Sequence, residues 1–234
     1  PLESRKGGYL ETLELRLSDY IKRIEKFDNE FARNDRNSTS ASIKKMGDDI
    51  INVIKLHLSG KVEDAYKSFS KILDDNRKHL DNLTLHTNKE KEVFFRVRYS
   101  EKDITEKKDI FHIPFSLRHL VDTMRYSIAG VPCLYFGNTI YDCWLEMDKP
   151  DLNKLYISKF KNIKEIRILD FAITFHTLEK IATIEDQHPE QYSREKIESF
   201  LRLYPLILSC SFKKQNTNAK FNIEYIIPNM LLQW

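Results

Sequence analysis

Cysteine is scarce in this chain of 234 residues, which has only Cys133, Cys143 and Cys210 and no CxxC pair. An odd and widely spaced set is not the framework of a disulfide-built secreted domain. The cysteine pattern therefore predicts a reducing compartment, and we expect a cytoplasmic protein. No signal-peptide pattern follows Pro1, and we expect a fragment whose native start is missing.

Charge of one sign and long apolar runs are scarce as well. The 38 Lys and Arg residues nearly balance the 35 Asp and Glu residues, and the net charge is +3. Proteins that bind nucleic acid or a membrane surface through charge carry a basic face, so this balance favours neither partner. No stretch approaches the roughly 18 consecutive apolar residues of a membrane-spanning helix, so we expect no such helix.

The familiar short motifs of cofactor, metal and nucleophile sites are missing too. The chain has no GxGxxG, GxxxxGK[ST], HExxH or GxSxG pattern. His112 and His119 have a helical spacing, but Pro114 between them disfavours a shared helix face. We therefore expect no metal site, and the common motifs assign no function to this chain.

Apolar residues recur at helical spacing through the first 90 residues. One stripe runs over Leu10–Phe31, a second over Ile43–Leu58 and a third over Val62–Leu73. Each stripe predicts an amphipathic helix, and such a helix must cover its apolar face against another element. We expect an all-α module over residues 1–90 that regulates the protein or mediates self-association, with completion of the fold as the simpler alternative.

From residue 91 the pattern turns to strands and short helices. Runs of β-branched and aromatic residues predict strands at Val93–Tyr99, Pro132–Phe136, Leu155–Phe160, Ile166–Phe171, Leu206–Phe212 and Ile223–Ile227. Helices are predicted at 116–123, 140–147, 177–184 and 193–203. This mixed order indicates an α+β fold and not a doubly wound parallel sheet. We expect one domain over residues 91–234, cut inside a helix because Met230–Trp234 carries no stop signal.

The most informative segment runs from Arg125 to Glu146. It begins with the sequence RYSIAGVPCLYFGNT, which is uncharged after Arg125, and continues into a helix that ends in Glu146. Thr139 and Asp142 have the spacing of a capping box at the start of that helix. The segment resembles the central block of the RES domain family, which is named for its Arg, Glu and Ser. The approximate family pattern is R-[WFY]-[NS]-x-x-G-x-P-x-x-Y, a small turn and a helix ending in Glu.

Four further pieces stand in the family's order and extend the resemblance over residues 92–234. They are FFRV at 94–97, FHIPF at 111–115, LSCSF at 208–212 and EYIIP at 224–228. The third piece departs from the family, because Cys210 stands where a proline is common. Residues 1–90 lie outside the resemblance.

The resemblance implies an ADP-ribosyltransferase-like fold in which NAD lies in a cleft between two small sheets. Characterised family members break the nicotinamide–ribose bond of NAD by phosphorolysis or hydrolysis, and many are toxins neutralised by an antitoxin. For this chain it implies an NAD phosphorylase or NAD glycohydrolase that acts as a toxin or anti-phage defence effector. Inorganic phosphate is then a possible co-substrate, no metal is needed, and an antitoxin, another partner or homo-oligomeric assembly controls the activity.

The resemblance also implies roles for particular charged residues. Glu146 is the catalytic carboxylate that stabilises the ribosyl cation, because cleaving an N-glycosidic bond builds positive charge on the ribose. Arg96 binds the pyrophosphate with its planar fork, and Arg98 on the same strand face is the substitute. Arg125 is the second phosphate ligand.

Two uncharged residues complete the implied site. Tyr135 offers a flat face against which nicotinamide packs. Ser211 orients a ligand group or Glu146, and Ser209 is the alternative because side chains on one strand alternate between two faces.

Two other functions remain open from the sequence. The same site could transfer ADP-ribose to a protein or nucleotide acceptor. Alternatively, the chain could be a RES-like domain without catalysis that serves as a binding module, with its helices as the interaction surface.

Overall fold

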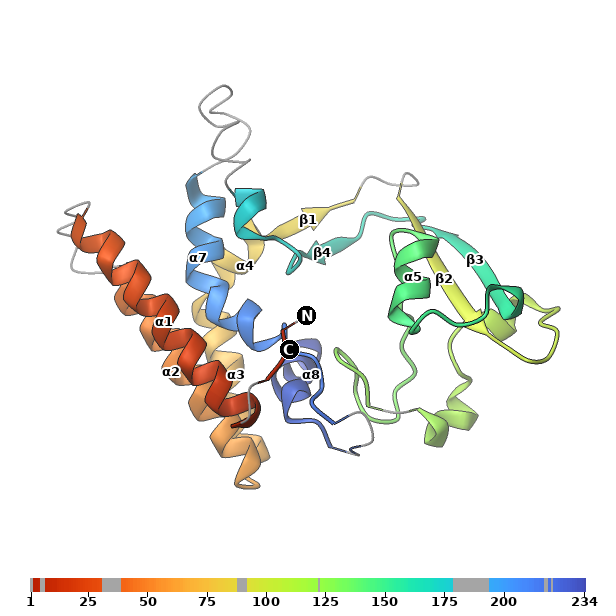
Figure 1. Ribbon diagram of the computed structural model, residues 1–234, viewed down its shortest axis with the longest axis horizontal. Coiled ribbons are helices and arrows are strands. Elements are labelled where there is room, and N and C mark those ends of the chain that lie inside the picture. The colour runs from red at the N-terminus through yellow and green to blue at the C-terminus, as the bar shows by residue number, and fades with distance from the viewer. Residues whose placement is uncertain are drawn as a thin grey trace. The chain divides into compact units, whose positions relative to one another are not determined.

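The chain folds into two compact units and passes from one to the other twice (Figure 1). The computed structural model describes residues 2–4, 7–30, 39–87, 92–121, 123–178, 194–216, 219 and 221–234. The helical unit comprises Pro1–Thr84 and Leu169–Trp234, and the central unit comprises Leu85–Ile168. The helical N-terminal region and the mixture of helices with short strands confirm the predicted α+β class.

The first crossing between the units lies near the predicted boundary at residue 90, but the second was not expected. The chain leaves the helical unit after Thr84 and returns at Leu169. The chain segments at the two crossings are the strands β1 (Thr84–His86) and β4 (Arg167–Leu169). These strands pair in a two-stranded sheet. The predicted domain of residues 91–234 is therefore divided between the two units.

Amphipathic helices build the helical unit. The three predicted stripes form α1 (Gly8–Glu30), α2 (Thr39–Leu58) and α3 (Val62–Asp75), followed by α4 (Arg77–Asn82) and, later in the chain, α7 (Arg194–Ser209) and α8 (Ile226–Gln233). Helix α2 packs against α1, α3, α7 and α8. Its core positions Ile43, Ile50, Val53 and Ile54 are fully buried. The helical unit thus has one core, to which both ends of the chain contribute.

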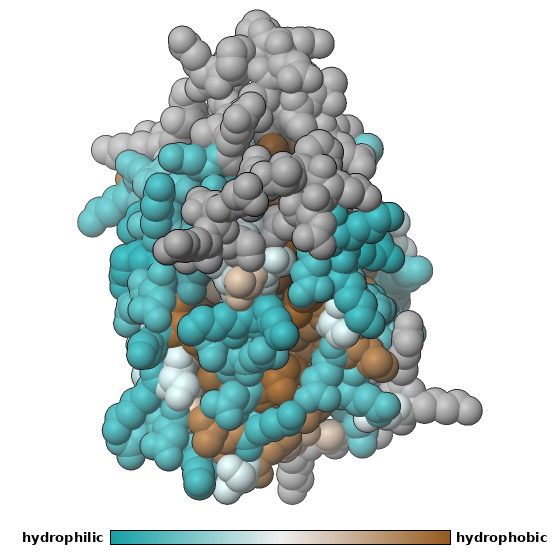
Figure 2. Space-filling view, turned by 90° about the vertical axis from the view of Figure 1, so that its left-hand side faces the viewer, coloured by the Kyte–Doolittle hydropathy of each residue, from teal (hydrophilic) through white to brown (hydrophobic). Residues whose placement is uncertain are grey.

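Viewed from the side of α1 and α2, the helical unit shows apolar side chains in a band between hydrophilic ones (Figure 2). A groove of about 610 Å³ runs between these two helices. Its apolar lining comes from Leu17, Ile21 and Ile51, and lysines and carboxylates border it. None of the described helices is long and apolar enough to cross a bilayer.

The two predicted late strands are wrong. Leu206–Ser209 continues helix α7, and Ile223–Ile227 forms a 3₁₀ turn that leads into α8. The apolar run Leu206–Leu208 suggested a strand, but these residues are buried on every side, and a fully buried helix has no polar face to mark its period. The helix predicted at 193–203 accordingly extends to Ser209.

Helix α7 also contains Pro205, although proline in a helix interior normally kinks or ends the helix. Proline has no N–H, so the carbonyl of Leu201 loses its intrahelical partner. The hydroxyl of Tyr20 on α1 donates a hydrogen bond to that carbonyl at 2.9 Å. A tertiary contact thereby satisfies the group that the proline leaves unpaired.

The central unit contains the two predicted strands as β2 (Val93–Tyr99) and β3 (Leu155–Lys161), which form an antiparallel pair. Arg96 lies opposite Ser158 in this ladder. The helix predicted at 140–147 is α5 (Ile140–Glu146). The central unit also contains three 3₁₀ turns at Lys107–Ile110, Phe115–Leu120 and Leu152–Lys154, and the loop that carries the RES-like block lies between the second turn and α5 along the chain.

Other predicted elements of this region differ in length or type. The strand predicted at Pro132–Phe136 is a loop, and the bridge to Phe95 is made by Gly137, directly after it. The strand predicted at Ile166–Phe171 is shortened to β4, and the helix predicted at 116–123 is a 3₁₀ turn. The helix predicted at 177–184 begins at Phe175, and its residues after Leu178 lie outside the described chain.

Replacing Gly47 by alanine should stabilise the helical unit. Gly47 lies inside α2, and an added Cβ would meet the Leu17 methyl carbons at 3.6 and 3.8 Å, which is ordinary packing distance. Because glycine costs conformational entropy in a helix, Gly47→Ala should raise the free energy of unfolding by about 0.5–1 kcal/mol. The measurement is urea denaturation followed by far-UV circular dichroism.

Gly60→Ala is the opposite control. Gly60 ends α2 with φ of +83°, a left-handed conformation that a Cβ strains, so this change should cost about 1–2 kcal/mol. If Gly47→Ala destabilises as much as Gly60→Ala does, the described packing of α1 on α2 is wrong.

The stability of the helical unit should fall as the pH drops below about 6.5, in part because of His79. Its Nδ1 lies 3.0 Å from the Ser199 hydroxyl on α7, to which Asn82 donates a hydrogen bond. Burial, with a smaller effect of Arg202, lowers the pKa of His79 from the ordinary value of 6.5. The unfolded chain then binds the proton more readily, so stability is present above pH 6.5 and is lost as the pH falls.

The test compares urea midpoints at pH 7 and pH 5 for the native chain and for His79→Gln. The variant should show a smaller loss of stability on acidification. An equal loss in both proteins would remove His79 from the explanation.

Candidate functional site

A cavity of about 280 Å³ lies in the central unit. Arg96 of β2 forms one side, and residues of the loop between 121 and 135 form most of the rest. The described residues that line it are Arg96, Ile113, Leu120, Val121, Met124, Ser127, Val131, Pro132, Cys133 and Tyr135. Two of the five predicted site residues, Arg96 and Tyr135, therefore line one cavity. They come from segments almost 40 positions apart.

Arg96 supplies the only guanidinium among the described lining residues, most of which are apolar. Its side chain is half-buried, with Nε donating to the Ile110 carbonyl at 2.8 Å and a terminal nitrogen to the Tyr135 carbonyl at 3.5 Å. Burial is the main cause that lowers the pKa of Arg96, followed by repulsion from Arg98. No carboxylate of the described residues pairs with it. Among the residues that the structure describes, nothing neutralises the charge of this cation, which suits an anionic ligand group.

Turns within the loop explain several positions of the RES-like pattern. The Ser127 hydroxyl, which is buried, accepts from the Met124 N–H at 2.8 Å and donates to the Met124 carbonyl at 2.7 Å. Gly130 has φ of +70°, and the Val131 N–H closes the turn on the Ile128 carbonyl at 2.9 Å. The pattern's serine and glycine thus shape the cavity wall.

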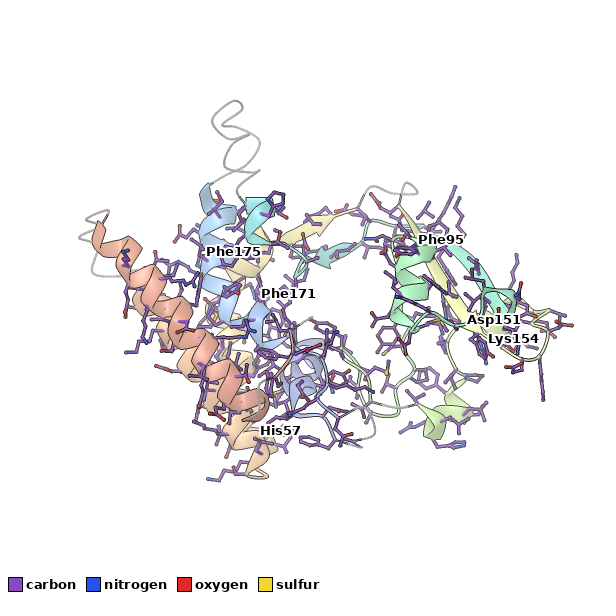
Figure 3. All side chains as sticks on the ribbon, in the orientation of Figure 1. His57, Phe95, Asp151, Lys154, Phe171 and Phe175 are labelled. Atoms are coloured by element: carbon purple, nitrogen blue, oxygen red, sulfur yellow. The ribbon has the colours of Figure 1, made fainter. Side chains whose placement is uncertain are left out.

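The block is joined to β2 by a short bridge. The N–H of Gly137 donates to the Phe95 carbonyl at 2.8 Å, and the Phe95 N–H donates to the Gly137 carbonyl at 2.9 Å. The thiol of Cys143 on α5 donates to the same Phe95 carbonyl at 3.3 Å. Figure 3 shows Phe95 on β2 beside α5. Arg96, the next residue of the strand, is thereby held in register with both the loop and the helix.

Helix α5 begins with the predicted cap. The Asp142 N–H donates to the Thr139 hydroxyl at 3.0 Å, and that hydroxyl donates to the Asp142 carboxylate at 2.7 Å. Glu146 is the last residue of α5. Cys143, three positions earlier, contacts β2, so Glu146 lies on the same side of the helix.

Glu146 and Arg125 stand outside the lining of the cavity. The Glu146 side chain is exposed and makes no hydrogen bond or ion pair with the described residues. Arg125 is half-buried, and its carbonyl accepts a hydrogen bond from the Tyr135 hydroxyl at 3.3 Å, which joins the two ends of the loop. The roles predicted for both residues remain predictions.

Ser211 belongs to the helical unit, just after the end of α7. Its hydroxyl donates to the Ile207 carbonyl at 2.6 Å, and its own carbonyl accepts from the Leu2 N–H at 2.8 Å. Ser209, the alternative, is fully buried, and its hydroxyl donates to the Leu206 carbonyl at 2.7 Å. Because the expected strand is a helix, the argument that one strand face presents both serines does not apply.

The sequence did not single out the residues that fix this geometry. Gly137 and Cys143 join the block to β2, and only the position of a glycine between Tyr135 and the helix hinted at a close approach. Ile113, Leu120 and Met124 form the apolar lining, and nothing in their spacing marked them. Among the described residues no group of three or more His, Cys, Asp or Glu side chains could hold a metal ion.

Replacing Gly137 by alanine should destabilise the central unit. An added Cβ would lie 2.6 Å from Cys143 Sγ and 3.0 Å from the Thr139 carbonyl oxygen. The loop or α5 must shift to relieve this overlap, so we expect a loss of about 1–3 kcal/mol. The measurement is urea unfolding followed by Trp144 fluorescence in a Trp234→Phe background, where Trp144 is the sole tryptophan.

The double variant Gly137→Ala/Cys143→Ala is the control, since it removes the closest of these contacts. It should recover part of the lost stability. A Gly137→Ala protein as stable as its parent would contradict the close packing of the bridge.

Comparison with known proteins finds a relative that matches along the whole chain. The chain is 31% identical over 243 aligned residues to a protein named "Putative toxin YopC" from Bacillus subtilis (strain 168). The alignment covers 100% of this chain and 54% of that protein, so the chain spans about half of its relative's length. No family profile matches the chain, and no solved structure matches it.

Proposed function

We propose that this chain is the NAD-degrading part of a toxin, which breaks the nicotinamide–ribose bond by phosphorolysis or hydrolysis. The observation that carries the proposal is the meeting of Arg96 and Tyr135 in one cavity. Both residues were selected from the resemblance to the RES family, on separate pieces of its pattern. Their convergence is what a shared ligand site requires and is not a consequence of their sequence positions.

The chemistry of the cavity fits a dinucleotide with a cationic ring. The Arg96 guanidinium would bind a phosphate oxygen through its terminal nitrogens. Tyr135, whose side chain is 43% exposed, presents a ring face to a planar group such as nicotinamide. The volume of about 280 Å³ lies near the lower limit of ligand pockets, so one nucleoside-sized half of NAD would enter.

The reaction needs stabilisation of a positive charge on the ribose. As the carbon–nitrogen bond breaks, its electron pair leaves with nicotinamide, which departs as a neutral molecule. The carboxylate of Glu146 would stabilise the oxocarbenium ion that remains, until an oxygen of phosphate or water forms the new bond. Arg125, whose carbonyl contacts Tyr135, is the residue we propose for the incoming phosphate.

The relative supports the toxin part of the proposal. Its printed name describes a toxin, and the likeness extends over both units of this chain. The helical unit therefore accompanies the central unit in that protein as well. A free NAD-degrading activity harms its host, so we propose control by an antitoxin, by another partner or by self-association through the helical unit.

The first test is incubation with NAD, with and without phosphate, and chromatographic separation of nicotinamide from the adenosine-containing product. The native chain should release nicotinamide, and Glu146→Gln should reduce the rate by about 10²–10³-fold because it removes the carboxylate charge. Product that appears only with phosphate indicates phosphorolysis. NAD label that moves onto macromolecules in a lysate would instead indicate ADP-ribosyl transfer.

Arg96→Gln and Arg98→Gln form a matched pair on one strand face. Arg96 lines the cavity, whereas Arg98 is exposed and donates to the Asp109 carbonyl. Arg96→Gln should raise KM for NAD about tenfold or more, since a charge-assisted contact is lost, and Arg98→Gln should leave it unchanged. Nicotinamide release that is absent from the folded native chain, with and without phosphate, would overturn the proposal and favour a binding module.

A further inference from the structure

A further groove lies in the helical unit, between α1 and α7. Its volume is about 560 Å³, within the range of small-molecule sites. The lining is Arg16, Asp19, Tyr20, Arg23, Ile24, Phe175, Leu201, Tyr204 and Leu208. Neither the resemblance nor the proposed reaction uses any of these residues.

One side of this groove is aromatic. The rings of Tyr20 and Tyr204 lie 4.4 Å apart, and Phe175 lies 5.1 Å from Tyr204 and 5.3 Å from Phe200. Figure 3 shows Phe175 beside α7. Phe175 is 45% exposed although it belongs to this ring cluster. It therefore leaves part of a flat aromatic surface uncovered at the groove, where a planar group can stack.

The other side of the groove is cationic. Arg16, Tyr20 and Arg23 follow one another at helical spacing, so they share one face of α1. The Nε atom of Arg16 is buried and has no hydrogen-bond partner. Although Asp19 lies within one turn of both arginines, neither arginine forms an ion pair with a described residue. A buried donor of this kind costs free energy unless a ligand satisfies it.

The electrostatics of Tyr204 agree with this arrangement. Burial raises the pKa of Tyr204, and the charges of Arg16 and Arg23 oppose that rise. Both guanidinium groups therefore act on the same hydroxyl, and all three residues line the groove. An anion placed there would meet two cations and a hydroxyl donor.

We propose that the groove between α1 and α7 binds a nucleotide that carries at least two phosphates. The base would stack on Phe175, and the phosphates would bind Arg16 and Arg23, whose Cα atoms are separated along α1 by about 10 Å. An extended peptide fits less well, because the walls are helices whose backbone groups already bond within the helix. This site is separate from the proposed NAD cavity and does not depend on its function.

The test is calorimetric titration of ADP into the full chain carrying Arg96→Gln, which weakens nucleotide binding in the NAD cavity. ADP should bind with saturation, and adenosine, which lacks phosphate, should bind at least tenfold more weakly. Arg16→Gln and Arg23→Gln should each weaken ADP binding about tenfold or more, since each removes charge-assisted hydrogen bonds. Lys67→Gln is the matched control, because Lys67 is an exposed cation of the same unit on α3 and pairs with Glu63.

Two results would overturn the proposal. One is the absence of saturable ADP binding to a protein whose thermal unfolding matches that of the native chain. The other is equal ADP affinity in Arg23→Gln and Lys67→Gln; Arg23 is exposed, so its replacement should leave folding intact. Failure of NAD cleavage would leave this result unchanged, because the background variant already lacks Arg96.

Discussion

The paired hydrogen bonds between Phe95 and Gly137 are the constraint on which the candidate site depends. They attach the loop of the RES-like block to the middle of β2, directly before Arg96. Cys143 bonds to the same Phe95 carbonyl, so the start of α5 is fixed to the same point. Because a side chain at 137 would collide with Cys143, only glycine allows the helix, the loop and the strand to meet there. The cavity between Arg96 and Tyr135 is a consequence of that close approach.

The helical unit also depends on a hydrogen bond between residues that are distant along the chain. Pro205 removes an N–H from α7, and the Tyr20 hydroxyl on α1 replaces it as the donor to Leu201. The same tyrosine brings α1 close to Tyr204, and this contact forms one side of the aromatic and cationic groove. A single interaction thus allows the helix to continue and also shapes a surface that can bind a ligand. Both compact units therefore contain a cavity with an arginine and a tyrosine, although their sequences and architectures differ.

The outcome for the serines shows where inference from the sequence was weakest. The helices α1 to α3, the strands β2 and β3 and the capped helix α5 have strong periodicity or caps, and all were predicted. The segment that contains Ser209 and Ser211 is apolar without a polar face, so its period gave no distinction between a strand and a buried helix. Its place in the family order favoured a strand, but burial against α2 in the helical core stabilises the helix. The boundary at 168 and 169 was missed for the same reason, because the sequence does not show which core an apolar segment joins.

What the sequence determined alone is local: the amphipathic stripes, the Thr139 cap and the α+β class. Spacing and capping encode these features because they depend on neighbours within a few positions. Only the tertiary structure decided that Arg96 and Tyr135 share a cavity, that the chain returns to its first helices, and that Arg16, Arg23 and Phe175 border one groove. Those relations arise from packing between residues that are distant along the chain, and no local pattern records them.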